Sequence, residues 1–256
     1  MIYTYKKGTG IGRLAKDLRL SIAWPYHNLT KKRSYDVDIN WGVKNLLITE
    51  GTPEILNVNI ANATSKVACF GVLKNAGILV PRWDTSYEAL RERLQGAKIT
   101  ILARKDELSK GRGIRKVDET SPDIPGADFY VERLSCLREA RIHVWRGRII
   151  CEQVKYLPEG CESFIHNFEN GATYSSNSKL EKFFNAEQAE TARQNSIKAI
   201  EALNLSFGAV DVMLTKKGKV YILEVNTAPG IRAASTYGAY REALKGRVKE
   251  KYSAQN

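Results

Sequence analysis

The clearest helical pattern in the chain runs from Ala186 to Leu203. Small and apolar side chains recur there every three or four positions, as one buried face of a helix requires. They are Ala189, Ala192, Ser196, Ala199, Ile200 and Leu203. Asn185 precedes the segment and Gln188 follows three positions later, which is the arrangement of a capping box. The pattern therefore predicts a long helix that begins directly after Asn185.

Shorter helices are predicted earlier in the chain. One covers residues 65–76, with Thr64 as its cap, and it ends at Gly77. Another follows Thr85, which forms a capping box with Glu88. Near the N-terminus, glycines alternate over residues 8–12 and interrupt a first strand. We expect a turn there, followed by a helix, and no Walker loop, because no Gly-Lys-Ser/Thr sequence follows.

Strand patterns dominate residues 98–156. We expect strands at 99–103, 129–132, 140–145 and 148–155, with Arg146-Gly147 as a tight turn between the last two. A second hairpin is predicted from strands at 207–214 and 219–225. Because helices and strands alternate early and hairpins come late, the fold class is α/β or α+β, with two or three lobes.

Composition is typical of a globular protein. The chain has 256 residues, of which 43% are hydrophobic and 27% charged. No apolar run approaches the roughly 20 residues of a membrane helix, and the N-terminus lacks the apolar core of a signal peptide. We therefore expect a cytoplasmic protein that makes no membrane contact. The four cysteines form no metal-binding spacing, which predicts free thiols.

The formal net charge of +12 changes this picture, because it favours an acidic partner. A nucleotide, a nucleic acid or an acidic peptide would each satisfy it. The basic residues are dispersed, and no long basic block marks a nucleic-acid surface. A phosphate-binding cleft and a nucleic-acid surface are both left open.

The late hairpin carries the strongest chemical signal. If Lys217-Gly218 forms a two-residue turn, Asp211 lies directly opposite Glu224, and Asn226 lies on the same face. Facing carboxylates cost on the order of 0.2–1 kcal/mol, and the flanking residues are apolar. A hard cation between them would explain the pair, since Mg²⁺ prefers carboxylate oxygens together with substrate phosphates.

We therefore predict that Asp211, Glu224 and Asn226 bind Mg²⁺, with Mn²⁺ as an alternative. Two other interpretations of the hairpin are left open. The carboxylates could form an acidic pair that faces solvent at a sheet edge, or one of them could act as a general acid or base.

The segment Glu224-Val225-Asn226-Thr227-Ala228-Pro229-Gly230 resembles the metal-binding signature of the ATP-grasp superfamily. The resemblance is to RimK-type glutamate ligases and, more distantly, to D-alanine–D-alanine ligase. It extends well over residues 63–237 and only in outline over the first sixty. It implies three lobes at 1–63, 64–130 and 131–256, with ATP between the central and C-terminal lobes.

The resemblance also implies a set of nucleotide-binding residues. Lys66 and either Arg104 or Lys105 would supply cations to the phosphates, and a glycine loop containing Gly111 and Gly113 would close over them. Further along the chain, a hinge would read the adenine, one acidic side chain would take the ribose hydroxyls, and one amide would lie near the phosphates. The residues at these positions are Glu132 and Arg133 for the hinge, Glu139 for the ribose and Asn167 for the amide.

Two further basic residues are implied as catalytic. Arg141 would lie near the transferred phosphate, and Lys155 would hold the acceptor carboxylate. D-alanine ligases carry an arginine two residues before the metal aspartate, where this chain has Ala209. That difference favours a RimK-like relative.

The implied reaction joins a carboxylate to an amine through an acylphosphate. The partners would be small-molecule or peptide substrates, with an amino acid, a peptide or a protein as acceptor, and a homo-oligomer is an open expectation. The alternatives are an ATP-grasp kinase, or a ligase or binding protein directed to nucleic acid.

Overall fold

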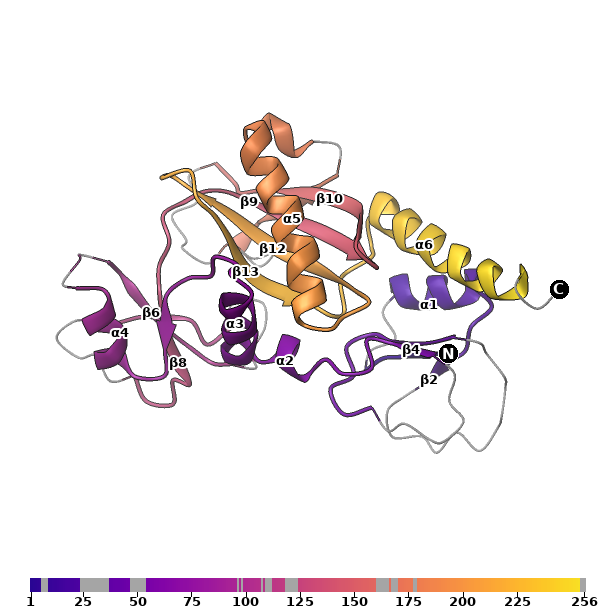
Figure 1. Cartoon of the computed structure of the whole chain (residues 1–256), viewed down its shortest axis with the longest axis horizontal. Helices are drawn as coiled ribbons and strands as arrows, with labels where there is room; N and C mark the ends of the chain where they lie inside the picture. Colours follow the sequence, from indigo (N-terminus) through magenta and orange to yellow (C-terminus); the bar gives the residue numbers. More distant parts are fainter. Residues whose placement is uncertain are drawn as a thin grey trace.

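The computed structural model describes residues 1–5, 9–23, 37–46, 54–95, 97, 99–106, 108, 112–117, 124–159, 166, 170–176 and 179–253. These residues form three sheets and the helices that cover them (Figure 1). A small N-terminal sheet lies at one end of the molecule. A second sheet, called the central sheet because its residues lie in the middle of the sequence, lies at the other end, and a five-stranded sheet lies between the two. The mixed α/β class expected from the sequence is confirmed.

The N-terminal sheet has the order β2-β1-β3-β4, and all its neighbouring strands are parallel. Its strands are β1 (Ile2–Tyr3), β2 (Ile22–Ala23), β3 (Val37–Asn40) and β4 (Glu54–Leu56). Helix α1 (Thr9–Asp17) connects β1 to β2. Parallel strands need such crossover connections, which is why this lobe alternates strand and helix.

Helix α1 differs from the expectation of a glycine turn. Gly10 and Gly12 lie inside the helix, while Gly8 is outside the described residues. A glycine within a helix costs about 1 kcal/mol relative to alanine. Burial of Ile11 and Leu14 on one face offsets that cost, so the helix begins earlier than the glycines suggest.

The central sheet is antiparallel, with the order β5-β8-β6-β7. Its strands are β5 (Trp83–Asp84), β6 (Ile101–Arg104), β7 (Arg115–Lys116) and β8 (Phe129–Glu132). Helix α4 (Tyr87–Arg93) packs on one face of this sheet, where Leu90 joins its core. Helix α3 (Lys66–Asn75) packs on the other face through Phe70, which contacts Phe129.

The caps of α3 and α4 differ from the predicted ones by one residue. Ser65 accepts a hydrogen bond from the Ala68 N–H at 3.1 Å, and Ser86 accepts one from the Ala89 N–H at 3.2 Å. Both serines have the extended backbone that an N-cap requires. Thr64 cannot serve, because it ends the short helix α2 (Ala61–Thr64).

The five-stranded sheet is antiparallel, in the order β11-β10-β9-β12-β13. Its strands are β9 (Cys136–Trp145), β10 (Arg148–Tyr156), β11 (Thr173–Ser175), β12 (Phe207–Thr215) and β13 (Val220–Asn226). Between β9 and β10, Arg146 and Gly147 both have positive φ, of 45° and 74°. The predicted tight turn is therefore confirmed, since two such residues match the twist of a hairpin.

Helix α5 (Ala186–Ala202) covers one face of this sheet (Figure 1). Asn185 and Gln188 form the predicted capping box at its start. The 3₁₀ turn η2 (Leu180–Lys182) precedes it. The opposite face of the sheet carries the polar side chains discussed below, and helix α6 (Ala234–Ser253) packs across one end of it.

The N-terminal lobe shares a core with the C-terminal lobe. Trp41, which follows β3, lies 5.1 Å from Phe207 of β12 and 5.3 Å from Tyr240 of α6 between ring centroids. Helices α1 and α6 lie side by side above this core (Figure 1). In the described part of the chain, no helix is both long and apolar enough to span a membrane.

Asn57 joins the same two lobes through hydrogen bonds. Its side chain accepts from the Ser206 and Phe207 N–H groups at 2.8 and 3.2 Å and donates to the Phe207 carbonyl at 2.9 Å. It is buried, and its φ of 58° suits asparagine or glycine. Three backbone groups of the C-terminal lobe, two buried and one partly buried, thus depend on one side chain of the N-terminal lobe.

We expect Asn57→Gly to lower the free energy of unfolding by about 2 kcal/mol. Glycine keeps the backbone conformation but leaves two buried groups and one partly buried group without their partner. A buried group without a partner costs about 1–3 kcal/mol, less any compensation by water. Urea unfolding followed by circular dichroism measures the change. The matched control is Asn204→Gly, at an exposed asparagine with φ of 52°. Equal stability of the two variants would contradict the prediction.

Candidate metal and nucleotide site

The hairpin of β12 and β13 brings Asp211 directly opposite Glu224, as predicted. The turn differs from the prediction. Thr215 pairs with Lys219 through an N–H to carbonyl bond of 2.9 Å, so the loop has three residues and ends at Gly218, with φ of 77°. A register shift between Asp211 and Val212 compensates for the longer loop.

This register shift is a β-bulge that inserts Leu223 into β13, because Val212 pairs with Ile222 while Asp211 pairs with Glu224. It decides which face each side chain takes. Val220, Ile222 and Val225 pack in the core under α5. Strict alternation would place Glu224 in that core together with Ile222. The bulge turns Glu224 to the opposite face, where Asp211 lies.

A row of polar side chains crosses four strands on this face. Gln153 of β10 pairs with Arg141 of β9, Arg141 with Asp211 of β12, and Asp211 with Glu224 of β13. The Arg141 guanidinium donates to both Asp211 oxygens, from Nε at 2.6 Å and from the terminal nitrogen at 2.8 Å. Arg141 therefore neutralises one of the two facing carboxylates.

The two carboxylates have opposite pKa shifts. Burial raises the pKa of Asp211, but the charge and hydrogen bonds of Arg141 outweigh it and the pKa is lowered. Burial and the neighbouring Asp211 charge together raise the pKa of Glu224. Glu224 is thus the carboxylate whose negative charge is less well compensated.

Two cations from the central region lie in the electrostatic field of Glu224. Burial lowers the pKa of Lys66 and of Arg104, and the Glu224 charge opposes that shift in both. The Lys66 ammonium donates to the carbonyls of Asp106 at 2.6 Å and Leu108 at 2.7 Å. The structure therefore brings Lys66 at the start of α3 and Arg104 at the end of β6 towards the metal hairpin.

Two buried polar atoms at this site have no hydrogen-bond partner within the described residues. They are Nδ2 of Asn226 and Nε of Arg104. Buried donors are normally satisfied, so both positions call for an acceptor from outside the chain. Carboxylate and amide oxygens suit Mg²⁺, and arginine N–H groups suit phosphate. The residues present fit a magnesium–nucleotide complex.

A second ionic cluster lies beside the row. Glu139 accepts hydrogen bonds from the Lys155 ammonium and, at 2.5 Å, from His166 Nδ1. Burial alone would raise the pKa of Glu139, but these two partners outweigh it and the pKa is lowered. The Tyr174 ring packs against the guanidinium of Arg141 at 4.6 Å and the ammonium of Lys155 at 5.4 Å. Glu139 and Lys155, for which separate roles were predicted, are thus ion-paired with each other.

The predicted hinge residues are bonded within the protein. Glu132 forms an ion pair of 2.7 Å with Arg82, and its N–H donates to the Arg82 carbonyl at 2.9 Å. The Arg133 N–H donates to the Thr100 carbonyl at 2.8 Å. Their role in adenine binding stays a prediction. If these hydrogen bonds persist when a nucleotide binds, other backbone or side-chain groups of the hinge would have to contact the adenine.

The glycine loop and its flanking cation are only partly described. Lys105 pairs with Asp128 at 3.0 Å, so Arg104 is the member of the pair that faces the site. Gly113 has φ of 71°, as a turn requires. Gly111 and Asn167 lie outside the described residues, and their roles stay predictions.

Three residues of the site were not predicted. Gln153 lies two positions before Lys155 on one strand, so alternation could have placed it on the same face. Tyr174 belongs to a three-residue strand without a periodic pattern, and His166 lies in a connecting segment. No local signal marks either one, because long-range packing brings both to the site.

Comparison with known proteins gives a sequence match in the part of the chain that carries the site. Residues 141–246 match the model of the D-ala D-ala ligase C-terminus. A D-alanine–D-alanine ligase of Treponema denticola is 44% identical over 61 residues, which are 23% of this chain and 17% of that enzyme. The chain thus matches less than a fifth of the length of this curated relative.

Solved structures resemble the whole chain. D-alanyl-alanine synthetase A from Vibrio cholerae superimposes with a TM-score of 0.69 at 14% identity, over 97% of this chain and 96% of that one. The ATP-grasp ligase PsnB complexed with its minimal precursor gives 0.67 at 14%, over 96% and 97%. Macrocyclase MdnC from Microcystis aeruginosa, bound with precursor peptide MdnA, gives 0.64 at 13%, over 96% and 98%.

These likenesses define the fold as ATP-grasp. The C-terminal family model matches less than half of the chain, and it agrees with the predicted resemblance to the ATP-grasp superfamily. The predicted ATP-grasp fold is therefore confirmed.

The unequal compensation of the two carboxylates predicts stability changes of opposite sign. Without metal, Glu224→Gln should raise the free energy of unfolding by up to about 1 kcal/mol, because it removes a like-charge contact. Asp211→Asn should lower it by about 1.5–3 kcal/mol, because Arg141 loses its charged partner. Denaturant midpoints measured in EDTA test both.

The control for these variants is Glu181→Gln. Glu181 is exposed and pairs with Arg193 at 2.6 Å, so the change should stay within about 0.5 kcal/mol. If Glu224→Gln destabilised the protein as much as Asp211→Asn, the charge of Glu224 would be as well compensated as that of Asp211.

Proposed function

We propose that the protein is an ATP- and Mg²⁺-dependent ligase that joins a carboxylate to an amine. The observation that carries the proposal is the pair Asp211 and Glu224, which face each other beside Asn226. Nδ2 of Asn226 has no hydrogen-bond partner among the described residues. The ATP-grasp fold and the matched D-ala D-ala ligase C-terminus support the ligase class.

The nucleotide would lie between the central sheet and the five-stranded sheet. Asp211, Glu224 and Asn226 would hold Mg²⁺, which supplies charge neutralisation and orientation at the phosphates when bound. Lys66 and Arg104 approach the same point from the central region, as their electrostatic coupling to Glu224 supports. Arg104 would donate its unpartnered Nε to a phosphate oxygen as part of a planar fork.

Arg141 would have one role when the site holds no cation and another when a cation is bound to Asp211. In the structure it neutralises Asp211. With a cation on Asp211, its guanidinium would be free to stabilise negative charge on the transferring phosphoryl group. Stacking on Tyr174 limits how far it moves. Lys155 would orient the acceptor carboxylate once its contact with Glu139 opened.

The reaction would proceed through an acylphosphate. A substrate carboxylate attacks the γ-phosphate of ATP and releases ADP, and an amine then displaces phosphate to form the amide. Among the solved relatives, PsnB and MdnC are bound to precursor peptides, and a third is a D-alanyl-alanine synthetase. They support an amino acid or a peptide as substrate.

Glu224→Gln and Asp211→Asn should each reduce ATP turnover at least about 100-fold, in the range seen when an electrostatic stabiliser is removed. Both should also lose Mg²⁺-dependent ADP binding in isothermal titration, while circular dichroism shows a folded chain. Glu190→Gln on exposed α5 is the matched control. Normal ATP turnover by either Glu224→Gln or Asp211→Asn would contradict the metal assignment.

An ADP-release screen should identify the reaction class. Carboxylates and amines, including amino acids, peptides and polyamines, are tested alone and in pairs. A ligase releases product amide and phosphate only when both partners are present. ADP release with a carboxylate or an alcohol alone, together with a stable phosphorylated product, would identify a kinase instead.

A further inference from the structure

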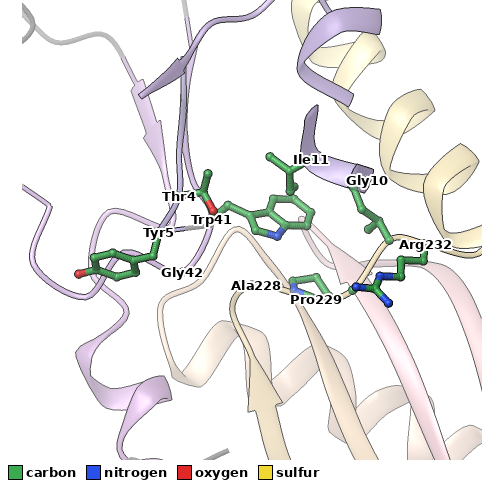
Figure 2. Close-up of a pocket in the computed structure, with 11 residues that line it drawn as sticks. Thr4, Tyr5, Gly10, Ile11, Trp41, Gly42, Ala228, Pro229 and Arg232 are labelled. Atoms are coloured by element: carbon green, nitrogen blue, oxygen red, sulfur yellow. The ribbon is translucent and has the colours of Figure 1, made fainter. Parts of the chain in front are cut away.

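A cavity of about 280 Å³ opens beside the loop that follows β13 (Figure 2). The N-terminal lobe forms one wall, and residues 228–232 form the opposite wall. Its lining is mostly apolar, and the side chains that matter below are Ile11, Trp41, Pro229, Ile231 and Arg232. The cavity begins two residues after the predicted metal ligand Asn226, so a bound molecule would lie next to the metal site.

Close backbone contacts hold the two walls in place. A Cβ at Gly10 would lie 2.8 Å from Cγ1 of Ile231, and a Cβ at Gly42 would lie 2.6 Å from Cβ of Ala228. Gly42 also has φ of 85°. Both positions therefore need glycine for the loop to approach this closely. The cavity is bounded by packed contacts and is not a loose gap between lobes.

The chemistry of the lining is asymmetric. Trp41 and Ile11 are buried and present apolar surface from the N-terminal lobe. On the other wall, Arg232 lies beside Pro229 (Figure 2). Arg232 is exposed and has no ion-pair or hydrogen-bond partner in the part of the chain that is described, where no acidic side chain lines the cavity. One unpaired guanidinium thus borders an apolar space.

We propose that this cavity binds an apolar group that carries a carboxylate. Arg232 would pair with the carboxylate as a planar fork, while Trp41 and Ile11 would contact the apolar group. The proposal rests on the ligase function and names the class of one of its two substrates. A single apolar amino-acid residue, free or at the C-terminus of a peptide, has this chemistry.

The same features disfavour other substrates. A polyamine would meet the positive charge of Arg232 with no described acidic side chain to compensate. A small side chain such as that of alanine would leave part of the cavity unfilled, and dispersion contacts with the cavity walls would be lost. The pocket is therefore selective for size as well as for charge.

Direct binding without ATP tests the proposal. Isothermal titration compares N-acetylphenylalanine with its amide and with N-acetylalanine. The wild type should bind the acid about tenfold more tightly than the amide, as a charged hydrogen bond implies, and should bind it more tightly than N-acetylalanine. Arg232→Gln should remove the preference for the acid. Arg232→Lys should keep part of it, and Arg13→Gln should keep it all.

Arg13 is the matched control because it is an exposed arginine on α1, stacked on Tyr237 at 4.3 Å, and does not line the cavity. Four results would each overturn the proposal. The wild type could bind acid and amide equally, bind N-acetylalanine as tightly as N-acetylphenylalanine, or bind no probe at all. The fourth is a preference for the acid that survives Arg232→Gln. The peptide Gly-Gly-Phe separates the two sources. Its binding, with a preference over its own amide, indicates a peptide end, whereas binding of unblocked phenylalanine without binding of the peptide indicates a free residue.

The binding assay also separates this proposal from the proposed function. Neither ATP nor metal takes part in it, so a chain that released no ADP would still show the Arg232-dependent preference. Conversely, a ligase with a different substrate would release ADP while failing the binding test.

Discussion

The rest of the site depends on the contact between two carboxylates on adjacent strands. Asp211 and Glu224 face each other on an otherwise apolar hairpin, and like charges in that position are unfavourable. Compensating cations come from different parts of the chain: Arg141 on the neighbouring strand, Lys66 at the start of α3 and Arg104 on the central sheet. The charge pair thus links the central and C-terminal lobes before any ligand binds.

Most other ionic groups near the site are already paired, which limits the groups that are free to bind a nucleotide. Lys155 is bound to Glu139, and Lys105 is bound to Asp128. Among the described residues, the buried side-chain atoms left without a partner are Arg104 Nε and Asn226 Nδ2. Since an unpaired buried donor is costly, these two atoms mark where an external acceptor gains the most.

The sequence predicts the pairing of Asp211 with Glu224 correctly, but for a reason that is partly fortuitous. A two-residue turn would place Asp211 opposite Glu224, and the real three-residue loop alone would have shifted that pairing by one residue. The bulge at Leu223 restores it. No local sequence pattern indicates the bulge. The bulge lets Ile222 pack in the core while Glu224 lies on the opposite face, and that requirement exists only once the sheet has formed. Helix patterns and the capping box at Asn185 were predictable because they are local, whereas Tyr174 was not.

The loop after β13 couples substrate position to metal position. It begins at Asn226 and forms one wall of the apolar cavity, and its closest contacts are with Gly10 and Gly42 of the N-terminal lobe. The N-terminal lobe is itself fixed to β12 by Trp41 and Asn57. A change in that lobe would therefore move the cavity wall and, through the same short segment, Asn226, the proposed metal ligand. Sequence resemblance is weakest in this lobe, yet its contacts fix the segment that joins the proposed substrate cavity to the proposed metal site.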